Sequence, residues 1–330
     1  MKRERLPFRL EAALVDTIWA GGKLKRDYHK ETPWEKVAES WELSCHPSGE
    51  SVIRDGAYAG RKLSEYFAEE GREAAGSLWQ TERFPLLIKL IDSDRALSLQ
   101  VHPDDDYGWR EEGQPGKTEM WYVLEAEPGA EMICGFSEDL TPEEIAQSIA
   151  EGTILSKVNH IPAHRGDVFF VQAGTIHGIG GGITVAEIQQ NSDVTYRIHD
   201  YGRVGPDGKP RALHIRQAKE VLNPHALRVN TSPGGETTQG ENWRRQGIVS
   251  CPYFTVWHYE AEGDLALRTG EDSFAALTVI GGEAVISCEE RTLPVQKGDT
   301  VFVPAGIKNY HWTGKGEFLL TTLRTDWRTE

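Results

Sequence analysis

Short runs of alternating apolar and polar residues, bounded by glycine and proline, recur along most of the chain. Successive side chains of a β-strand point to opposite faces, so this alternation predicts strands with one buried face. Residues 86–91 and 96–101 predict two buried strands, and residues 40–44 predict a shorter one. The pattern therefore predicts a mainly β protein.

Three segments carry helical signals instead. Residues 63–70 have amphipathic spacing and precede Gly71, a typical helix terminator. The run Thr141-Pro142-Glu143-Glu144 combines an N-cap, a proline at the first helical position and a capping-box glutamate, which predicts a helix to about residue 151. Residues 213–222 predict a third helix. We expect a few helices inserted into a β framework.

One segment of the chain recurs. Residues 166–177 (GDVFFVQAGTIH) match residues 298–309 (GDTVFVPAGIKN) at half of the positions, including both glycines. Upstream, residues 122–127 match 278–283, and the helix predicted after Thr141 accounts for the extra residues of the first copy. Such strands resemble a cupin, a small double-sheet jelly-roll barrel, and two copies make a bicupin. The alternative is a chance similarity of two β-hairpins.

Four side chains of metal-ligand type lie in or beside predicted strands of the first copy, at Gln100, His102, Glu119 and His177. Two imidazoles, a carboxylate and an amide are plausible ligands for zinc or a similar divalent ion. No pair forms a helical HExxH or a CxxC, so the fold must bring them together. Residues two apart on a strand share a face, which pairs Gln100 with His102 and Lys117 with Glu119.

The two copies differ at these positions, because His177 aligns with Asn309 and Glu119 with Ala275. His311 lies two residues beyond the aligned position and has no acidic partner in the copy. We therefore expect residues 1–228 to form a metal-binding cupin domain with an N-terminal extension and inserted helices. Residues 229–242 are the expected linker. Residues 243–330 are expected to form a second, structural cupin domain without a metal.

Composition excludes several classes of protein. The net charge of −15 argues against nucleic acid or an anionic membrane as a partner. No apolar run approaches the ~20 residues of a membrane span, and the N-terminal residues lack the apolar core of a signal peptide. The four cysteines are scattered without CxxC spacing. They indicate reduced thiols in a cytoplasmic protein.

Other candidate groups have simpler interpretations. His160 and His164 precede the repeat and are expected to be ordinary core or surface residues. The glycines at 178 and 180–182 favour a hairpin turn, because no P-loop Lys-Ser/Thr follows them. The acidic run 104–106 is expected to cap a turn in solvent instead of binding a cation.

The chain is similar to the type I phosphomannose isomerases (mannose-6-phosphate isomerases), in particular their short bacterial form, over nearly its whole length. The QVHPD block is specific, since generic cupins use His-x-His with a nearby glutamate. The blocks that carry the resemblance are IWAGG at 18–22, ESWELS at 39–44, LSLQVHPDD at 97–105, KTEMWY at 117–122, AGTIH at 173–177, EIQQNSD at 187–193 and YRIHDY at 196–201.

The resemblance implies a reaction and a set of site residues. The residues that match the family's ligands, for one zinc ion per chain, are Gln100, His102, Glu119 and His177. Arg197 matches the family's active-site arginine, and Lys117 and Glu187 match residues that line the same pocket. The sequence after Arg197 departs from the long-form signature, so a phosphate-binding role for Arg203 stays open.

The implied reaction is the reversible interconversion of mannose 6-phosphate and fructose 6-phosphate. It moves a proton between adjacent carbons through an enediol-type intermediate, and a closed-shell metal can polarise the oxygens involved. Lys117 and Arg197 are expected to stabilise the oxyanion or hold the phosphate. Glu187 is expected to serve as a base if burial raises its pKa. The group that takes the proton stays open.

Two other functions are compatible with the fold. One is a non-catalytic bicupin that binds sugar phosphates, and the other is an iron-dependent cupin enzyme. The missing His-x-His and the presence of Gln100 argue against an oxygenase, and storage does not need Lys117, Glu187 and Arg197 together. The sequence is silent on oligomeric state.

Overall fold

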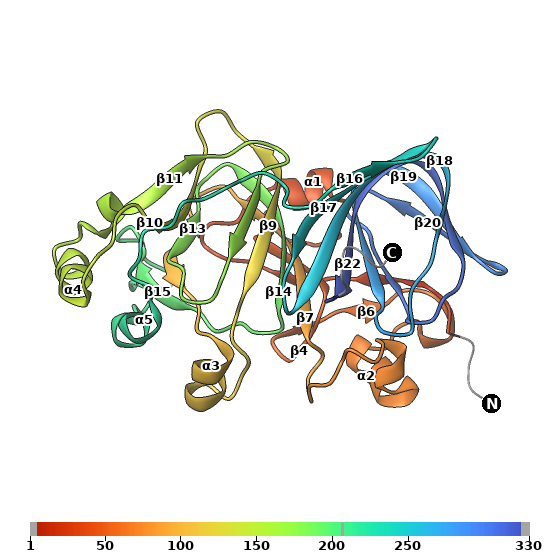
Figure 1. Ribbon diagram of the computed structural model, residues 1–330, viewed down its shortest axis with the longest axis horizontal. Coiled ribbons are helices and arrows are strands. Elements are labelled where there is room, and N and C mark those ends of the chain that lie inside the picture. Colours follow the sequence, from red (N-terminus) through yellow and green to blue (C-terminus); the bar gives the residue numbers. More distant parts are fainter. Residues whose placement is uncertain (1–4, 206–207, 325–330) are drawn as a thin grey trace.

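Two β-structures lie side by side in the computed structural model, which describes residues 5–205 and 208–324 (Figure 1). The first contains most of the yellow and green strands, and the second contains the blue ones. The helices are short, and most of them lie at the periphery of the strands. The prediction of a mainly β, two-barrel protein with a few helices is confirmed. No helix in the described part is long and apolar enough to cross a membrane.

Two sheets form the first barrel and enclose a buried cluster that includes Trp121, Val123, Met132, Ile179 and Val185. The six-stranded sheet has the order β12-β9-β14-β7-β3-β2, and the five-stranded sheet has the order β11-β10-β13-β8-β15. The strands of the first sheet are β2 (Ala13–Val15), β3 (Glu39–Leu43), β7 (Leu86–Ser93), β9 (Glu119–Ala126), β12 (Val168–Val171) and β14 (Ile183–Gln190). Those of the second are β8 (Leu99–Val101), β10 (Glu131–Phe136), β11 (Val158–Pro162), β13 (His177–Ile179) and β15 (Tyr196–His199).

One nine-stranded sheet forms the second structure, with the order β16-β17-β18-β22-β19-β21-β1-β6 and β20 beside β19. Its long strands curve around a core that includes Trp257, Leu277 and Trp312. The strands are β1 (Phe8–Glu11), β6 (Val52–Ile53), β16 (Thr237–Gln239), β17 (Trp243–Ser250), β18 (Phe254–Leu267), β19 (Ala275–Cys288), β20 (Arg291–Gln296), β21 (Thr300–Val303) and β22 (Tyr310–Leu323).

The internal repeat is visible in the strand order. The sequence β2-β3-β7-β14-β9-β12 in the first barrel corresponds to β16-β17-β18-β22-β19-β21 in the second. The register agrees as well, because Val171 pairs with Glu119 and the aligned Val303 pairs with Ala275. The alignment of Glu119 with Ala275 is therefore confirmed, and chance similarity of two hairpins is excluded.

The repeated glycines occupy equivalent turns on either side of β12 and β21. Gly166 and Gly298 have φ angles of 90° and 95°, and Gly174 and Gly306 have 86° and 82°. Residues with a side chain rarely adopt such positive φ values. Backbone geometry therefore explains why both copies keep these glycines.

The N-terminal segment contributes to the second sheet. Phe8 of β1 pairs with Phe302 of β21, and their rings stack 5.3 Å apart. Strand β16 lies inside the predicted linker 229–242 and pairs with β17. The domain boundaries at 228 and 243 stay a prediction, but the sheet also recruits strands from outside 243–330.

The predicted helices are present. Thr141 caps its helix, donating its backbone N–H to Glu144 at 2.8 Å and accepting from the Glu144 N–H at 3.2 Å. The glycines at 180–182 join β13 to β14, but these two strands belong to different sheets and do not pair, so the prediction of a hairpin turn is wrong. The helices are α1 (Lys23–Asp27), α2 (Leu63–Glu70), α3 (Asp105–Glu111), α4 (Pro142–Ala150) and α5 (Ile215–Val221). Three 3-10 turns, Gly56–Tyr58, Arg72–Ala74 and Ile154–Lys157, and the hairpin of β4 (Cys45–His46) and β5 (Gly49–Glu50) complete the elements.

The acidic run at 104–106 begins a helix, which the sequence analysis missed. The Asp104 carboxylate accepts a hydrogen bond from the Tyr107 N–H at 2.9 Å and caps α3. Asp105 and Asp106 lie in the first turn, where the helix dipole favours negative charge.

Candidate active site

Three of the predicted site residues form a row across neighbouring strands of the first barrel. His177 of β13 is directly opposite Gln100 of β8, and Gln100 is directly opposite Arg197 of β15. Directly opposed residues of antiparallel strands point to the same face of the sheet. The register therefore places all three side chains on the inner face.

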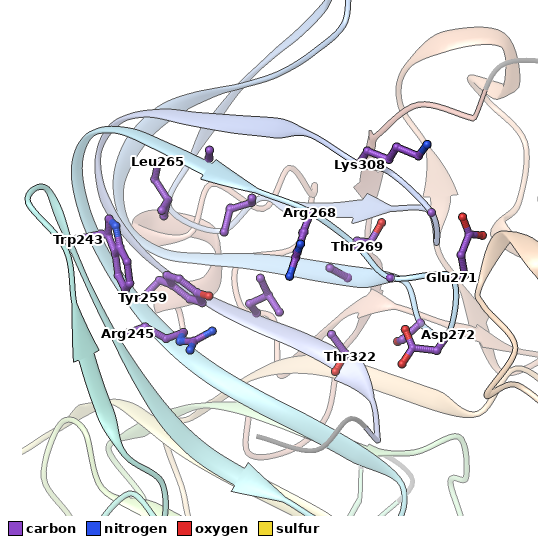
Figure 2. A pocket seen from close by; sticks show the side chains of 17 residues that line it. Trp243, Arg245, Tyr259, Leu265, Arg268, Thr269, Glu271, Asp272, Lys308 and Thr322 are labelled. Carbon is purple, nitrogen blue, oxygen red and sulfur yellow. The ribbon is translucent and has the colours of Figure 1, made fainter. Parts of the chain in front are cut away.

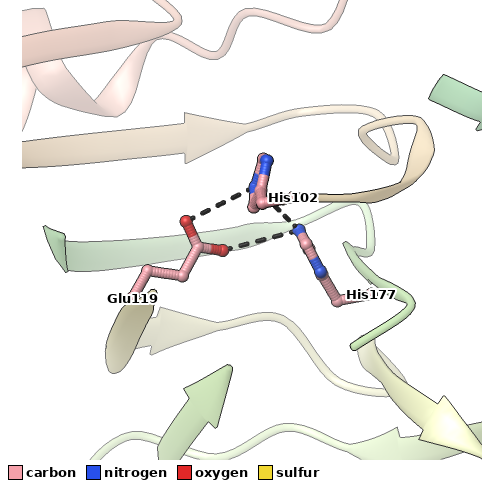
Figure 3. A group of neighbouring side chains, drawn as sticks. All are labelled: His102, Glu119 and His177. Atoms are coloured by element: carbon pink, nitrogen blue, oxygen red, sulfur yellow. Dashed lines mark hydrogen bonds and ion pairs between the residues drawn. The ribbon is translucent and has the colours of Figure 1, made fainter. Parts of the chain in front are cut away.

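His102, Glu119 and His177 converge in the buried interior (Figure 3). The Nε2 atoms of the two histidines are 3.1 Å apart. One carboxylate oxygen of Glu119 lies 3.6 Å from His102 Nε2, and the other lies 3.5 Å from His177 Nε2. One ligand atom from each residue falls within 4.8 Å of the others. The fold thus brings three of the four predicted ligands around one point.

The hydrogen bonds of the two imidazoles determine which nitrogen carries the proton. His102 Nδ1 lies 2.7 Å from the Val194 carbonyl, and His177 Nδ1 lies 2.8 Å from the Thr175 carbonyl. A carbonyl only accepts, so both Nδ1 atoms must donate and both neutral rings present an Nε2 lone pair to the centre. Burial lowers the pKa of His177 to about 3 and that of His102 well below its ordinary value, which keeps the rings neutral.

This arrangement fits a divalent cation. Two lone pairs face each other at 3.1 Å, and the buried Oε1 of Glu119 receives no hydrogen bond from the described residues. A metal ion satisfies all three acceptors at once. The Gln100 amide lies at the same place, with its nitrogen 3.3 Å from His177 Nε2, and rotation of the amide presents its oxygen instead.

Lys117 is buried against this cluster. Its ammonium lies 2.5 Å from Glu119 Oε2, 3.1 Å from His102 Nε2 and 3.6 Å from Glu187 Oε1. The ammonium therefore links the Glu119 carboxylate, with which a shared strand face was predicted, to the Glu187 carboxylate.

Glu187 is held by a group that the sequence analysis did not select. Lys89 of β7 is directly opposite Glu187 of β14, and its ammonium lies 3.1 Å from the carboxylate and 3.3 Å from Glu39. The Trp121 indole donates to the other Glu187 oxygen at 2.8 Å. The signal was visible in the sequence, because a lysine interrupts the apolar run LLIKLI. A buried lysine in such a strand needs a carboxylate partner.

The two buried carboxylates titrate in opposite directions. Burial raises the pKa of Glu119, and Lys117 only partly opposes this. Burial also raises the pKa of Glu187, but Lys117 and Lys89 together outweigh it and lower that pKa. The condition on which Glu187 was expected to serve as a base, a raised pKa, is therefore not met. The Glu187 carboxylate is held ionised by two ammonium groups.

Arg197 is half-buried beside the row. Its Nη1 donates to the Ala212 carbonyl at 2.9 Å, while its buried Nε has no hydrogen-bond partner in the described part of the chain. Burial and the neighbouring guanidinium of Arg211 lower its pKa. A donor without a partner on the inner face is suited to an anionic ligand.

His160, His164 and Arg203, which the sequence analysis also considered, do not join the cluster. His160 bonds to the Leu155 carbonyl at 3.0 Å, and His164 is exposed beside Asp167. Arg203 donates to the Ala96 carbonyl and to Asp200. Its guanidinium is therefore engaged in holding the loop.

The equivalent positions of the second barrel carry different groups. Ala275 stands where the first barrel has Glu119, and Asn309 contacts His311 at 3.1 Å on the surface. His311 does have an acidic partner, contrary to the sequence analysis, because Asp264 lies 3.0 Å away. Asp264 comes from β18, outside the aligned blocks, so the alignment did not reveal it.

Comparison with known proteins places these observations in a family. Residues 7–128 match the family model of the phosphomannose isomerase type I catalytic domain, and residues 245–323 match that of the mannose-6-phosphate isomerase cupin domain.

Full-length relatives give the same result. The chain is 37% identical to the mannose-6-phosphate isomerase of Streptococcus mutans serotype c, over 95% of this chain and 97% of the relative. It is 35% identical to mannose-6-phosphate isomerase ManA of Bacillus subtilis, over 96% and 99%. The crystal structure of the mannose 6-phosphate isomerase from Bacillus subtilis superimposes with a TM-score of 0.90 at 33% identity, covering 96% of this chain and 99% of that one. The chain therefore belongs to the type I phosphomannose isomerase family.

Proposed function

We propose that the protein is a metal-dependent aldose–ketose isomerase that interconverts mannose 6-phosphate and fructose 6-phosphate. The observation that carries the proposal is the buried set of two neutral imidazoles and a carboxylate, with two lysines and a second carboxylate beside it. Relatives that align over nearly the full length carry the name of this activity. Both the site chemistry and the family support the same reaction.

We assign one zinc ion per chain to Gln100, His102, Glu119 and His177. Nitrogen and oxygen donors of this kind suit zinc, which is closed-shell and accepts both. When bound, the ion would supply Lewis acidity toward the hydroxyl and carbonyl oxygens of the sugar without redox chemistry. The neutral Nε2 atoms and the Glu119 Oε1 without a donor are the features that fit it.

We assign the stabilisation of developing negative charge to Lys117 and Arg197. Lys117 is buried beside the ligand carboxylate, where a preorganised ammonium interacts strongly with an oxyanion. Arg197 lies at the end of the row through Gln100 and presents an Nε without a partner. Because the protein carries a net charge of −15, an anionic sugar needs such local positive groups.

We assign Glu187 to the site as an ionised carboxylate that Lys89 and Trp121 hold in place. Its lowered pKa makes it a weaker base than burial alone would produce. Its role in the proposal is to keep the ammonium of Lys117 oriented toward the substrate. Lys89 acts through Glu187 and is a positioning residue.

The cytoplasmic location is kept as part of the proposal, supported by four free cysteines in the described chain. A storage bicupin is less well supported, because binding alone does not need two buried lysines paired with three carboxylates. An iron-dependent enzyme would be favoured by a third histidine, where this cluster has an amide.

A coupled assay on mannose 6-phosphate tests the proposal. The enzyme is assayed as purified, after dialysis against a chelator, and after zinc is added back. We expect turnover that is lost with the metal and restored by zinc. Full activity in the chelated, metal-free protein, or no turnover in the zinc-loaded protein, would reject the proposal.

A further inference from the structure

A cavity of about 790 Å³ opens into the second barrel (Figure 2). It is separate from the metal cluster, because its lining comes from residues 243–322. Cavities of roughly 300–1,000 Å³ are typical of small-molecule sites. The second barrel therefore contains a space of the right size for a metabolite.

The register shows that this cavity is the counterpart of the site in the first barrel. Glu119 and Ala275 are equivalent, since each pairs with the aligned valine of the next strand. Two residues further along β9 and β19, Trp121 pairs with Glu187 and Leu277 pairs with Leu320. Ala275 and Leu320 both line the cavity. The two positions that hold carboxylates in the first barrel thus hold apolar side chains here.

At a third equivalent position the side chain is acidic in the first barrel and basic in the second. Glu39 of β3 pairs with Ile91, and Arg245 of β17 pairs with Tyr259 at the corresponding step of β18. Glu39 contacts the buried Lys89 in the first barrel, whereas Arg245 lines the cavity in the second. The substitutions remove three carboxylates and add one guanidinium, which favours an anion where the first barrel favours a cation.

Two guanidinium groups in the cavity are available to a ligand. The Arg268 side chain makes no hydrogen bond or ion pair with residues 5–205 or 208–324. The Arg245 side chain makes one hydrogen bond there, from Nε to the Thr238 hydroxyl at 3.3 Å. Figure 2 shows Arg245 on the same side of the cavity as Trp243 and Tyr259, and Arg268 near the middle of the cavity. The rings of Trp243 and Tyr259 lie 6.5 Å apart between centroids.

The acidic groups lie at the other end. Figure 2 places Glu271 and Asp272 on the far side from Arg245. Both carboxylates are exposed, with Lys308 on the same side, and are available to accept hydrogen bonds from neutral hydroxyl groups. A ligand that matches this division has a phosphate at one end, hydroxyl groups at the other and an apolar C–H face for the aromatic wall.

We propose that the second barrel is a binding site for a sugar monophosphate, with Arg245 and Arg268 holding the phosphate. The site lacks the metal ligands and the buried lysine–carboxylate network, so it binds without catalysing isomerisation. Duplication of the barrel has thus produced two sites for related ligands with different means of recognition.

The experiment counts binding sites by equilibrium dialysis of the metal-loaded protein against radiolabelled fructose 6-phosphate. Isomerisation leaves the label on the bound sugar and does not disturb the count. We expect the variant Arg245→Ala/Arg268→Ala to bind one equivalent fewer per chain than the unmodified protein. This difference does not depend on whether the first barrel binds the sugar, so it is independent of the proposed function.

Arg244→Ala is the matched control. It makes the same change of charge on the adjacent residue of β17, which pairs with Glu260 and does not line this cavity. Its site count should equal that of the unmodified protein. Because Arg268 is exposed and without partners, Arg268→Glu carries little risk to folding and should weaken the second site at least about tenfold. An equal count in the unmodified protein and the double variant, or unchanged affinity in Arg268→Glu, would overturn the proposal.

Discussion

The two barrels share a strand order and a register but differ in what their inner faces carry. At three equivalent steps the first barrel has Glu39, Glu119 and Glu187, and the second has Arg245, Ala275 and Leu320. Backbone pairing and positive-φ glycines are retained, while the charges are not. The comparison shows that the scaffold requires alternation and turns, whereas a handful of inward positions determine the chemistry.

The difference extends to the packing of the strands. Lys89 in the first barrel corresponds to Trp257 in the second, because each is directly opposite the equivalent residue of the neighbouring strand. Lys89 is stabilised by carboxylates and lies over the Trp41 ring, whereas Trp257 belongs to an apolar core. A buried charge network is costly unless every member is paired. The first barrel retains such a network beside the residues proposed to bind the metal.

The largest expected effect separates His177 from its counterpart Asn309. His177→Ala removes one Nε2 lone pair, and with it one proposed metal ligand, from the buried cluster. The metal should therefore be lost, and turnover should fall at least roughly a thousandfold. Asn309→Ala should leave metal content and turnover within about twofold. Metal analysis and the coupled assay measure both, with far-UV circular dichroism to show that the fold is kept. Equal effects of the two variants would contradict the division of roles.

The next effect concerns Arg197. Arg197→Lys keeps the charge but loses the planar set of donors, and loss of one preorganised donor typically lowers kcat by about 10²–10³. The matched control is Arg216→Lys on α5, whose exposed pair with Glu220 lies outside the row of site residues. If kcat of Arg197→Lys stays within about twofold of the control, Arg197 has no catalytic role.

A smaller effect sharpens the role of Lys89. Lys89→Met removes a positive charge that helps to lower the pKa of Glu187, so that pKa should rise and the acid limb of kcat/KM should move to higher pH. We expect kcat/KM at neutral pH to fall roughly tenfold or more, because one buried ion pair is broken. Lys36→Met, at an exposed pair with Asp94, is the control. An unmoved acid limb would show that Lys89 does not act through Glu187.

The smallest effect tests how the N-terminal strand supports the second barrel. The guanidinium of Arg9 in β1 donates to Asp55 at 2.8 Å, and the Arg9 backbone N–H donates to it at 2.9 Å. Burial raises the pKa of Asp55, but these bonds outweigh it and lower that pKa. A lowered carboxyl pKa contributes stability above its unfolded value, and that stability is lost as pH falls through the folded value. Arg9→Met should therefore lower Tm by roughly 2 °C at pH 7, and by less near pH 3.

Arg61→Met is the control for this measurement, since it breaks an exposed pair with Glu69. Differential scanning calorimetry at both pH values gives the comparison. A Tm difference for Arg9→Met that is as large near pH 3 as at pH 7 would contradict the assigned pair.

Much of the framework was predictable, because strand alternation and repeated glycines are local signals. The helix at Thr141 was predicted from its capping box, and the equivalence of Glu119 with Ala275 from the repeat alone. What escaped prediction depends on contacts between distant segments. The pairing of β1 with β21 joins residues almost 300 positions apart, and no local pattern encodes it.

The candidate site shows the same limit. His102, Glu119 and His177 were selected from residue type and position, and the fold brings them together. The ionisation of Glu187 could not be predicted, because it depends on the combined charge of Lys117 and of Lys89, which comes from a strand about a hundred residues earlier. Asp264 was missed as the partner of His311 for the same reason. Sequence patterns locate the chemistry, but neighbouring strands set its charge state.

The central claim is that one of two equivalent barrels holds the metal. Anomalous diffraction at the zinc edge, from crystals of the zinc-loaded protein, tests it most directly. The account predicts one peak per chain, between His102, Glu119 and His177, with Gln100 beside it. It also predicts no peak near Ala275 and Asn309 in the second barrel. A peak in the second barrel, or none between the two histidines, would contradict the account.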